Sequence, residues 1–495
     1  MKTKIVRTRY APSPTGLFHV GGARTALFNF LFARSNDGIF IVRIEDTDIE
    51  RNIEGGIDSQ FENLKWLKLF FDESLENPGL YGPYVQSEKL DIYSNIAMNL
   101  VENKHAYKCF CSVDELILER EEALRNKLPP KYSRKCSTLN NEQIELMEKS
   151  KIPWTVRLKI SDEDIFEWED LIRGNISIPA TSMSDPIILK ANKTPTYNFA
   201  VSIDDSQMEI SHVLRGEEHI SNTPYQIAIS KLLDINKDII YGHLPLIVNE
   251  DRKKLSKRDN SVKQFIEEYK NMGFTPESII NYLALLGWNP KNNIEIKDLI
   301  TIINEFDIKD VSSSPSMFDF KKMEWVSKEH FKIMDNVSFF DFTNKFLSEN
   351  NKKLHNIESV LMLFKNQISY AGQLNHLIED FLRIDKISIK VLNENDIEIN
   401  DDIIKLIHDL KREFSFVDDW TLDAVDEVLK SIKNLTSLKG KHLFLPIRLI
   451  TTTKNSGPEL LKVIYLLGME NVKNNIDNFK IFIETYNKAI RSGEN

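Results

Sequence analysis

Hydrophobic and polar positions in the first fifty residues follow the pattern of a strand, a turn, a helix and a second strand. Residues 5–11 are expected to form a short strand, and residues 12–16 form a turn with two prolines and a glycine. The apolar positions of residues 22–34 suit a buried helix. Residues 39–44 are a nearly continuous apolar run, typical of a strand that is buried on both faces. This order predicts a βαβ unit and therefore a parallel sheet.

The middle of the chain differs from its start in composition and in its pattern of apolar positions. Residues 90–191 hold all three cysteines, a charged helical stretch at 113–127 and short strands such as 154–159. We interpret this region as an insertion between two halves of the sheet. We expect the sheet to resume with a strand at residues 196–202, and further short apolar segments follow at 239–240 and 244–248.

The pattern of the last part of the chain predicts helices. Pro276 stands at a helix start, and long helical patterns with few glycines and prolines dominate from about residue 337 onward. The predicted fold is an α/β Rossmann-type catalytic domain, whose parallel sheet is split by an inserted α/β subdomain, followed by all-α C-terminal domains. The predicted domains are residues 1–92 and 196–255 for the two halves of the sheet, 93–195 for the insertion, and 256–336 and 337–495 for two helical domains.

Composition sets limits on the class of protein. The 495 residues are 41% hydrophobic and 28% charged, which is ordinary for a globular chain and long enough for several domains. No run approaches the roughly 18 apolar residues of a membrane helix, and no apolar stretch follows the basic start as in a signal peptide. Three cysteines are too few for a disulfide scaffold, so we expect a cytoplasmic protein.

The net charge of −10 argues against a nucleic-acid partner, because such proteins are more often basic. It does not exclude one, since phosphates respond to charges within about 10 Å at physiological salt. A nucleic-acid site in this chain would need its basic residues to be clustered.

A first candidate site lies at the turn before the first helix. Gly21 and Gly22 lack a Cβ and let a phosphate approach the backbone, and the helix N-terminus favours an anion. His19 stands just before them and can donate a hydrogen bond to a phosphate oxygen. The alternative is a plain loop with a surface histidine.

A second candidate is the basic segment at residues 253–258, Lys-Lys-Leu-Ser-Lys-Arg. Lysine is a compact, mobile charge that can follow a leaving pyrophosphate. Leu255 can anchor the loop while Ser256 and Lys257 face the site. The alternative is a solvated charged face, which is what most basic runs are.

Taken together, residues 13–22 and 254–258 resemble the two ATP-binding signatures of class I aminoacyl-tRNA synthetases. Their residue patterns are similar to those of the glutamyl-tRNA synthetase family in particular. Further segments match that family's pattern, so that the resemblance covers nearly the whole chain; they are residues 9–13, 43–48, 194–198, 212–220 and 440–448.

The resemblance implies an activity and its partners. A glutamate carboxylate attacks the α-phosphorus of ATP, with Mg²⁺ on the phosphates, and the glutamyl-adenylate then esterifies the terminal adenosine of tRNA(Glu). It also implies that tRNA is needed for the activation step and that the enzyme is a monomer. The insertion would bind the acceptor end, residues 256–336 the tRNA stem and residues 337–495 the anticodon. The sequence leaves open whether tRNA(Gln) is also charged.

The expected site residues fall into three groups. The catalytic residues are His19, Lys254 and Lys257. The ATP contacts are Pro12, Thr15, Gly16, His19, Gly21, Gly22, Glu218, Leu255, Ser256, Lys257 and Arg258. The glutamate contacts are Arg9, Ala11, Ser13, Glu45, Tyr197 and Arg215.

The chemistry of a dicarboxylic amino acid supports the third group. Arginine forms bidentate pairs with carboxylates, so Arg9 and Arg215 suit glutamate better than glutamine. Glu45 is the candidate partner of the substrate ammonium, although residues 45–48 also fit a helix N-cap cluster. Val201 stands where some family members have asparagine, and we assign it no polar role.

The three cysteines suggest a metal site. Structural zinc takes four ligands, and zinc-holding members of the family have a Cys-x-Cys pair and a distant cysteine. Their fourth ligand is a tyrosine four residues before that cysteine or a histidine two residues after it. Here these positions are Tyr132 and Thr138, so we predict structural Zn²⁺ on Cys109, Cys111, Tyr132 and Cys136. The alternative is three free or buried thiols.

One stretch of the C-terminal half is locally basic. The segment Gly-Lys-x-x-Phe-x-Pro-x-Arg at 440–448 resembles the family's anticodon-binding region. We therefore predict tRNA contacts from Lys439, Lys441 and Arg448, against the alternative of an exposed amphipathic helix. Aromatic residues nearby could stack on anticodon bases, although most of them suit a core; they are Phe414, Phe416, Trp420 and Phe444.

Three other functions compete with this interpretation. A paralogue that glutamylates a modified tRNA base would lack the helical C-terminal half. A glutaminyl-tRNA synthetase would have β-barrels there. A non-catalytic RNA-binding protein on a degenerate synthetase scaffold would not need His19, Lys257 and Arg215.

Overall fold

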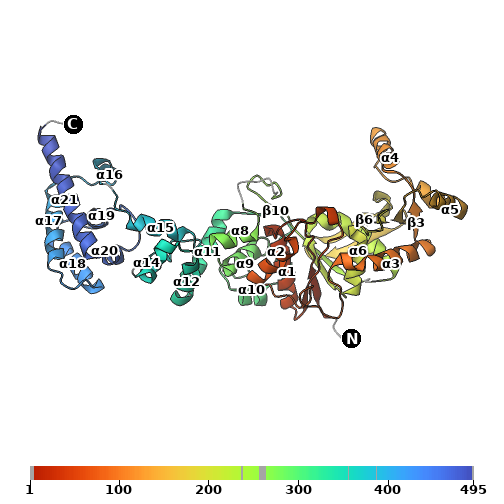
Figure 1. Ribbon diagram of the computed structural model, residues 1–495, viewed down its shortest axis with the longest axis horizontal. Helices are drawn as coiled ribbons and strands as arrows, with labels where there is room; N and C mark the ends of the chain where they lie inside the picture. Colours follow the sequence, from red (N-terminus) through yellow and green to blue (C-terminus); the bar gives the residue numbers. More distant parts are fainter. Residues whose placement is uncertain (1–4, 236–237, 256–262, 355, 386, 493–495) are drawn as a thin grey trace. The chain divides into compact units, whose positions relative to one another are not determined.

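The computed structural model describes residues 5–235, 238–255, 263–354, 356–385 and 387–492 (Figure 1). The chain forms two compact units, Met1–Val326 and Ser327–Asn495, here called the N-terminal and C-terminal units. The boundary between them falls within helix α11 Phe320–Ile333.

The N-terminal unit mixes strands and helices. Its strands are β1 Arg7–Tyr10, β2 Ile39–Val42, β3 Ala106–Cys109, β4 Thr155–Leu158, β5 Ile165–Asp170, β6 Gly174–Pro179, β7 Ile187–Leu189, β8 His212–Gly216, β9 Ile240–Leu244, β10 Ile247–Val248 and β11 Ser316–Met317. Its helices before α11 are α1 Val20–Arg34, α2 Gly56–Trp66, α3 Leu90–Glu102, α4 Val113–Arg125, α5 Asn141–Lys149, α6 Tyr197–Gln207, α7 Thr223–Leu233, α8 Ile266–Met272, α9 Pro276–Leu285 and α10 Leu299–Glu305.

The predicted parallel sheet is confirmed. Strand β1 pairs with β2 in parallel, and β8 pairs with β9 in parallel, with Arg215 opposite His243. The two pairs are neighbours, because the Ser211 N–H donates to the Arg7 carbonyl at 3.1 Å. Helix α1 packs against β1, β2 and β8. The carboxyl ends of β1 and β8, where ligands of such sheets bind, therefore lie side by side.

The strand predicted for residues 196–202 is wrong, because Tyr197 opens helix α6. Alternating Tyr197, Phe199 and Val201 imitate the period of a strand. The helix instead buries a continuous run of residues, 199–205, so it has no polar face to reveal its helical period. The sheet resumes later, at β8.

The inserted region carries its own small sheet. Strands β3, β4 and β7 are antiparallel, and α4 and α5 lie beside β3, away from helices α8 to α10 (Figure 1). The hairpin of β5 and β6 joins the larger sheet instead, because β5 pairs in parallel with β9 at Asp170 and Tyr241. The insertion and the parallel sheet are thus linked by a shared strand.

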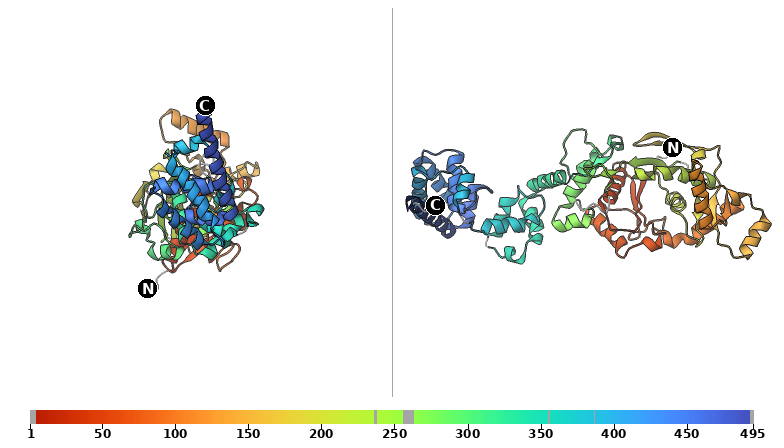
Figure 2. Two further views of the ribbon diagram at one scale, coloured as in Figure 1. Left: turned by 90° about the vertical axis from the view of Figure 1, so that its left-hand side faces the viewer. Right: turned by 90° about the horizontal axis from the view of Figure 1, so that it is seen from above.

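The C-terminal unit is helical, as expected, and no strand occurs in its described residues (Figure 2). Its helices are α12 Asn336–Thr343, α13 Glu349–Lys352, α14 Ile357–Phe364, α15 Gln373–Leu382, α16 Ile389–Glu394, α17 Asp401–Ser415, α18 Leu422–Leu435, α19 Lys441–Thr452, α20 Leu460–Leu467 and α21 Met469–Ser492. One apolar core joins α17, α18, α19 and α21, and another joins α12, α14 and α15. Across the described part of the chain, no helix is both long and apolar enough to cross a membrane.

Candidate active site

A cavity of ≈ 530 Å³ opens where β1 ends and α1 begins. Most of the residues predicted to bind ATP and glutamate line it; they are Arg9, Ala11, Pro12, Ser13, Thr15, Gly16, His19, Gly21, Gly22, Tyr197, Arg215, Glu218, Lys254 and Leu255. Glu45 is not among its lining residues. Ser256, Lys257 and Arg258 lie outside the described residues, so their roles stay predictions.

His19 is the N-cap of α1. It has extended backbone angles, and its Nδ1 atom accepts a hydrogen bond from the Gly22 N–H at 3.1 Å. An acceptor at Nδ1 places the proton of the neutral ring on Nε2. The side chain is exposed at the cavity, so the ring presents a donor beside the positive end of the helix.

The second basic segment folds back to the same cavity. A tight turn at residues 249–253 brings Lys254 beside Val248 of β10, and the Leu255 N–H donates to the Ile247 carbonyl at 3.2 Å. Lys254 Nζ lies 3.3 Å from a Glu218 oxygen at the cavity wall. The chain then returns at Gln264, whose carbonyl accepts from the Val20 N–H at 2.9 Å. The first signature and the described part of the second, Lys254 and Leu255, are therefore neighbours in space.

Arg24, in the first turns of α1, is a cation of this site that the sequence interpretation missed. It is 3% exposed, lines the cavity and donates to the carbonyls of Pro245 and Leu286. Burial lowers its pKa to about 10, so it keeps its charge at neutral pH. Its position one helical turn after Gly21 was the available signal.

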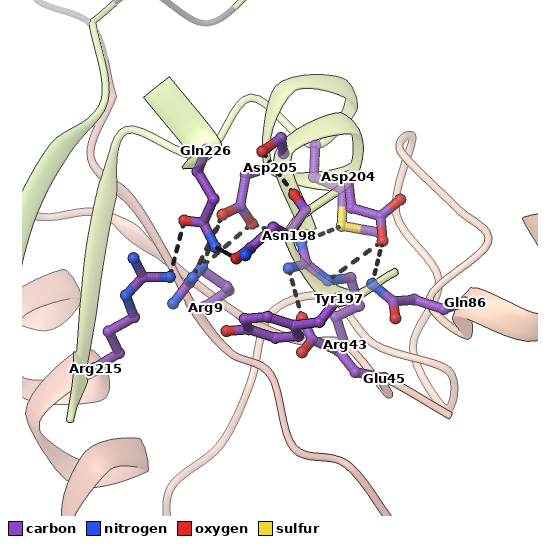
Figure 3. Close-up of polar contacts among 12 residues, drawn as sticks. Arg9, Arg43, Glu45, Gln86, Tyr197, Asn198, Asp204, Asp205, Arg215 and Gln226 are labelled. Atoms are coloured by element: carbon purple, nitrogen blue, oxygen red, sulfur yellow. Dashed lines mark hydrogen bonds and ion pairs between the residues drawn. The ribbon is translucent and has the colours of Figure 1, made fainter. Parts of the chain in front are cut away.

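Arg9 is held by a carboxylate from α6. Its Nε and Nη2 atoms lie 3.2–3.4 Å from Asp205, which also accepts from Arg43 at 2.7 Å (Figure 3). The pKa of Asp205 is lowered: burial alone would raise it, but the two guanidinium groups outweigh that effect. The carboxylate fixes Arg9 at the cavity wall with part of its charge already compensated.

Arg215 has a different environment. Its Nη1 donates to Gln226 at 2.9 Å, its Nη2 to Thr223 at 2.7 Å and its Nε to His243 at 3.3 Å (Figure 3 shows the contact with Gln226). All of these partners are neutral side chains, and among the described residues no carboxylate forms an ion pair with Arg215. A buried cation with only neutral partners favours an anionic ligand.

Glu45 lies just behind this wall. Its carboxylate accepts from Arg43 Nη2 at 2.9 Å. Burial raises the pKa of Glu45, and the charge of Arg43 opposes that change. Tyr197, which lines the cavity, also has a raised pKa, chiefly through burial and secondarily through the charge of Glu45. The predicted contact between Glu45 and a substrate ammonium stays a prediction.

The three cysteines come together as the sequence suggested. Their Sγ atoms lie within 4.8 Å of one another, and the Cys111–Cys136 pair is 3.5 Å apart. The Tyr132 hydroxyl lies 3.4 Å from Cys109 Sγ and 3.3 Å from Cys111 Sγ. Zn–S bonds of about 2.3 Å at tetrahedral angles separate sulfur atoms by about 3.8 Å, so the four groups fit a zinc ion.

The basic stretch of the C-terminal unit divides into exposed lysines and a half-buried arginine. Lys439 and Lys441 are exposed on either side of Gly440, at the start of α19. Arg448 is half-buried and donates to the Pro458 carbonyl at 2.5 Å, and burial lowers its pKa. Lys439 and Lys441 are therefore better placed than Arg448 to meet a phosphate.

The aromatic residues divide in the same way. Phe414 is fully buried in the core, and the half-buried Trp420 donates to the Tyr465 carbonyl at 2.8 Å. Phe416 and Phe444 are 72% and 43% exposed. The interpretation as core holds for the first pair only.

The acidic residues Asp204 and Asp205 were also missed by the sequence interpretation. Asp204 is completely buried and pairs with Lys89 at 2.5 Å. Two adjacent aspartates inside an apolar helix were the available signal, because buried charges require partners. Those partners are Arg9 of β1, Arg43 directly after β2 and Lys89 directly before α3, which sequence spacing does not relate.

Comparison with known proteins identifies the family. Residues 5–325 match the family described as tRNA synthetases class I (E and Q), catalytic domain, and residues 297–480 match an anticodon binding domain. A protein of Malacoplasma penetrans named glutamate–tRNA ligase is 50% identical over 479 residues, which cover 97% of this chain and 98% of that protein. A glutamate–tRNA ligase of Geobacillus thermodenitrificans is 43% identical over 482 residues, covering 95% and 97%.

A solved structure has the same fold. The glutamate tRNA ligase of Elizabethkingia meningosepticum, determined in complex with its amino acid, superimposes with a TM-score of 0.87 at 29% identity and covers 98% of this chain and 100% of that one. Matches of this extent leave no large segment unaccounted for. The chain belongs to the glutamate–tRNA ligase family of class I tRNA synthetases.

Proposed function

We propose that this protein activates L-glutamate with ATP and transfers it to the terminal adenosine of tRNA(Glu). The observation that carries the proposal is one cavity that joins an anion-binding helix terminus to two arginines. His19 and Lys254 stand on the phosphate side, and Arg9 and Arg215 stand on the amino-acid side. These are the groups that a nucleotide and a dicarboxylic amino acid require at adjacent positions.

The residues of the phosphate side act by electrostatics and positioning. The Nε2–H of His19 donates to a phosphate oxygen, and Lys254, with Lys257 of the undescribed segment, follows the departing pyrophosphate. ATP enters with Mg²⁺ on its phosphates. The glutamate α-carboxylate attacks the α-phosphorus, the bond to pyrophosphate breaks, and no nucleophilic side chain of the protein is needed.

The amino-acid side selects glutamate by charge. Arg215 keeps an uncompensated charge because its partners are neutral, and it binds a carboxylate of the substrate. Glutamine offers an amide there, which leaves the buried guanidinium without a counter-charge. Tyr197 lines the pocket near the substrate ammonium, and Glu45, behind the wall, supplies the negative charge that attracts it.

Two further parts serve the tRNA. Zinc bound by Cys109, Cys111, Tyr132 and Cys136 would cross-link β3 to the turn at residues 132–136 and so stabilise the insertion that receives the acceptor end. Lys439 and Lys441 contact phosphates of the anticodon arm. The helical C-terminal unit favours this function over the glutaminyl enzyme and over a paralogue without that half.

The test is charging of purified tRNA(Glu) with labelled glutamate by the full chain. Wild-type protein should form glutamyl-tRNA, whereas Arg215→Gln should lose at least about 100-fold in kcat/KM for glutamate, because a charged contact worth several kcal/mol disappears. His212→Asn, three residues earlier on the same strand, is the matched control and should retain activity. Absence of charging by well-folded wild-type protein would refute the proposal and favour a non-catalytic RNA-binding role.

A further inference from the structure

A buried row of three side chains connects the β5–β6 hairpin to Arg215. Asp170, the last residue of β5, lies with its Oδ2 atom 2.5 Å from His243 Nδ1. The Nε2 atom of the same ring lies 3.3 Å from Arg215 Nε. The side chains of Asp170 and His243 are 0% exposed, and neither lines the cavity. The sheet fixes this order, because Arg215 pairs with His243 of β9 and Asp170 pairs with Tyr241 of the same strand.

The direction of each hydrogen bond follows from the arginine. Its Nε–H is always a donor, so His243 Nε2 has to accept. The ring proton therefore sits on Nδ1, where it is donated to Asp170. Asp170 is itself held by the backbone N–H groups of Ile172, Arg173 and His243, at 3.0–3.1 Å. A carboxylate that is fixed in this way selects one tautomer of the neighbouring histidine, which in turn positions Arg215.

The environment keeps the ring neutral. Burial lowers the pKa of His243 and outweighs the opposing effect of the hydrogen bond that the ring donates to Asp170; the charge of Arg215 lowers the pKa further. The Tyr241 ring stacks on His243, with 6.2 Å between centroids and 6° between planes, which restrains the tilt of the imidazole. The acceptor lone pair of Nε2 is thus held in a fixed direction.

Three contacts then define the plane of the guanidinium. His243 holds Nε, Thr223 holds Nη2 and Gln226 holds Nη1. Thr223 is in turn within 3.1 Å of His243 Nε2, so the histidine supports two of the three contacts. None of them neutralises the guanidinium charge.

We propose that Asp170 and His243 are positioning residues that set the orientation of Arg215 and thereby the affinity of the enzyme for the carboxylate of glutamate. This inference rests on the glutamate-binding role proposed for Arg215. It places part of the determinant of amino-acid affinity on β5, a strand outside the cavity that belongs to the hairpin of the inserted region.

The competing explanation is structural, since the pair could simply fasten the hairpin to β9. Two substitutions, each of which reproduces the position of one ring nitrogen, separate the explanations. In His243→Asn the side-chain amide can occupy the Nδ1 position and keep the bond to Asp170, but the acceptor for Arg215 is lost. In His243→Gln the amide oxygen can occupy the Nε2 position and keep the acceptor, but the bond to Asp170 is lost.

Asp170→Asn tests the tautomer. The amide oxygen can still accept from the backbone N–H groups, while the amide nitrogen now faces His243 Nδ1 and donates to it. The ring proton then moves to Nε2 and points at the Arg215 Nε–H, so that two donors face each other. In a His243→Gln background the same change has no histidine tautomer to act on.

The experiment measures charging of tRNA(Glu) by the full chain and determines KM for glutamate, KM for ATP and kcat separately. We expect His243→Asn and Asp170→Asn to raise KM for glutamate about 10-fold or more, the cost of an unmatched buried donor, with KM for ATP unchanged. His243→Gln should be affected less than His243→Asn, and adding Asp170→Asn to it should change KM for glutamate no further.

Thermal unfolding and the His212→Asn variant, which removes a histidine of the same sheet away from Arg215, control for general destabilisation. An unchanged KM for glutamate in Asp170→Asn, or a larger effect of His243→Gln than of His243→Asn, would overturn the inference. If the wild-type protein failed to charge tRNA(Glu) at all, the proposed function itself would fail, so the two failures are distinguishable.

Discussion

His19 and Gly22 are joined by a hydrogen bond from the backbone N–H of the glycine to the imidazole Nδ1, 3.1 Å long. The histidine thereby caps α1 and at the same time lines the cavity. In the proposed function this side chain has two separable roles. The cap contributes to folding, and the Nε2–H is the proposed donor to the nucleotide.

His19→Asn should separate these functions. Asparagine is among the best N-cap residues, so the free energy of unfolding should stay within roughly 0.5 kcal/mol of wild type. The shorter amide cannot reach the phosphates, so kcat of ATP–pyrophosphate exchange should fall roughly 100-fold. Urea unfolding and exchange kinetics measure the two effects.

His19→Ala is the companion variant. It should lose about 1 kcal/mol of stability. Its kcat should fall by the same factor as that of His19→Asn. Equal activity of His19→Asn and wild type would show that the imidazole has no part in the chemistry.

Gly22 fits tightly against Tyr10. A Cβ built on this glycine would lie 2.7 Å from the tyrosine Oη, which is itself bonded to Gln60 at 2.9 Å. Gly22→Ala should therefore destabilise the N-terminal unit, since overpacking costs about 1–3 kcal/mol and exceeds the gain in helix propensity of up to about 1 kcal/mol.

Tyr10→Phe should reverse the sign of this effect. Without Oη the nearest atoms are ring carbons at 3.7 Å, an ordinary contact, and alanine should then stabilise the helix. Urea unfolding of the two single variants and the double variant forms the cycle. A destabilisation by Gly22→Ala that is the same in both backgrounds would contradict this account.

The cysteine cluster predicts a metal content. Protein purified without chelators should contain about one zinc per chain, and Cys136→Ser should abolish it, because two thiols and a phenol bind weakly. Tyr132→Phe should weaken binding while leaving the three thiols in place. Plasma emission spectrometry of freshly prepared protein measures the content, and zinc-free wild-type protein would refute the site.

Stability should fall as the pH decreases from about 6.5 to about 4. Burial lowers the pKa of His212 from 6.5 to about 4, and burial together with Arg215 does the same for His219. In this interval the unfolded chain binds more protons than the folded chain, so the free energy of unfolding decreases with each step toward acid. The lowered pKa of Asp205 changes the free energy of unfolding only at more acidic pH.

His212→Asn measures one share of this dependence. Its free energy of unfolding at several pH values should have a slope smaller by about one proton between pH 4 and 6.5. The comparison uses the slope, so a constant loss of stability in the variant does not affect it. An unchanged slope would show that His212 titrates normally in the folded chain.

Much of the fold could be predicted because its signals are local. Apolar runs and glycines defined β1, α1 and β2, and Pro276 marked the start of α9. Helix α6 could not be recognised, because a helix buried on all sides has no polar face and Tyr197, Phe199 and Val201 alternate like a strand.

The same distinction between local and distant signals applies to the candidate site. Residues inside short motifs, such as His19 and Arg215, could be placed from the sequence. The groups that orient them could not, because Asp205 meets Arg9 across 196 positions and Asp170 meets His243 across 73. The first pairing depends on how α6 packs against β1, and the second on the order of strands in the sheet; no local pattern records either.

The central claim is that this chain activates glutamate for tRNA(Glu). The most direct measurement is ATP–pyrophosphate exchange with glutamate and with glutamine, each with and without purified tRNA(Glu) and tRNA(Gln). We predict exchange with glutamate that depends on tRNA(Glu) and none with glutamine; the tRNA(Gln) arm shows whether that tRNA is also accepted. Exchange with glutamine, or no exchange under any condition, would contradict the account.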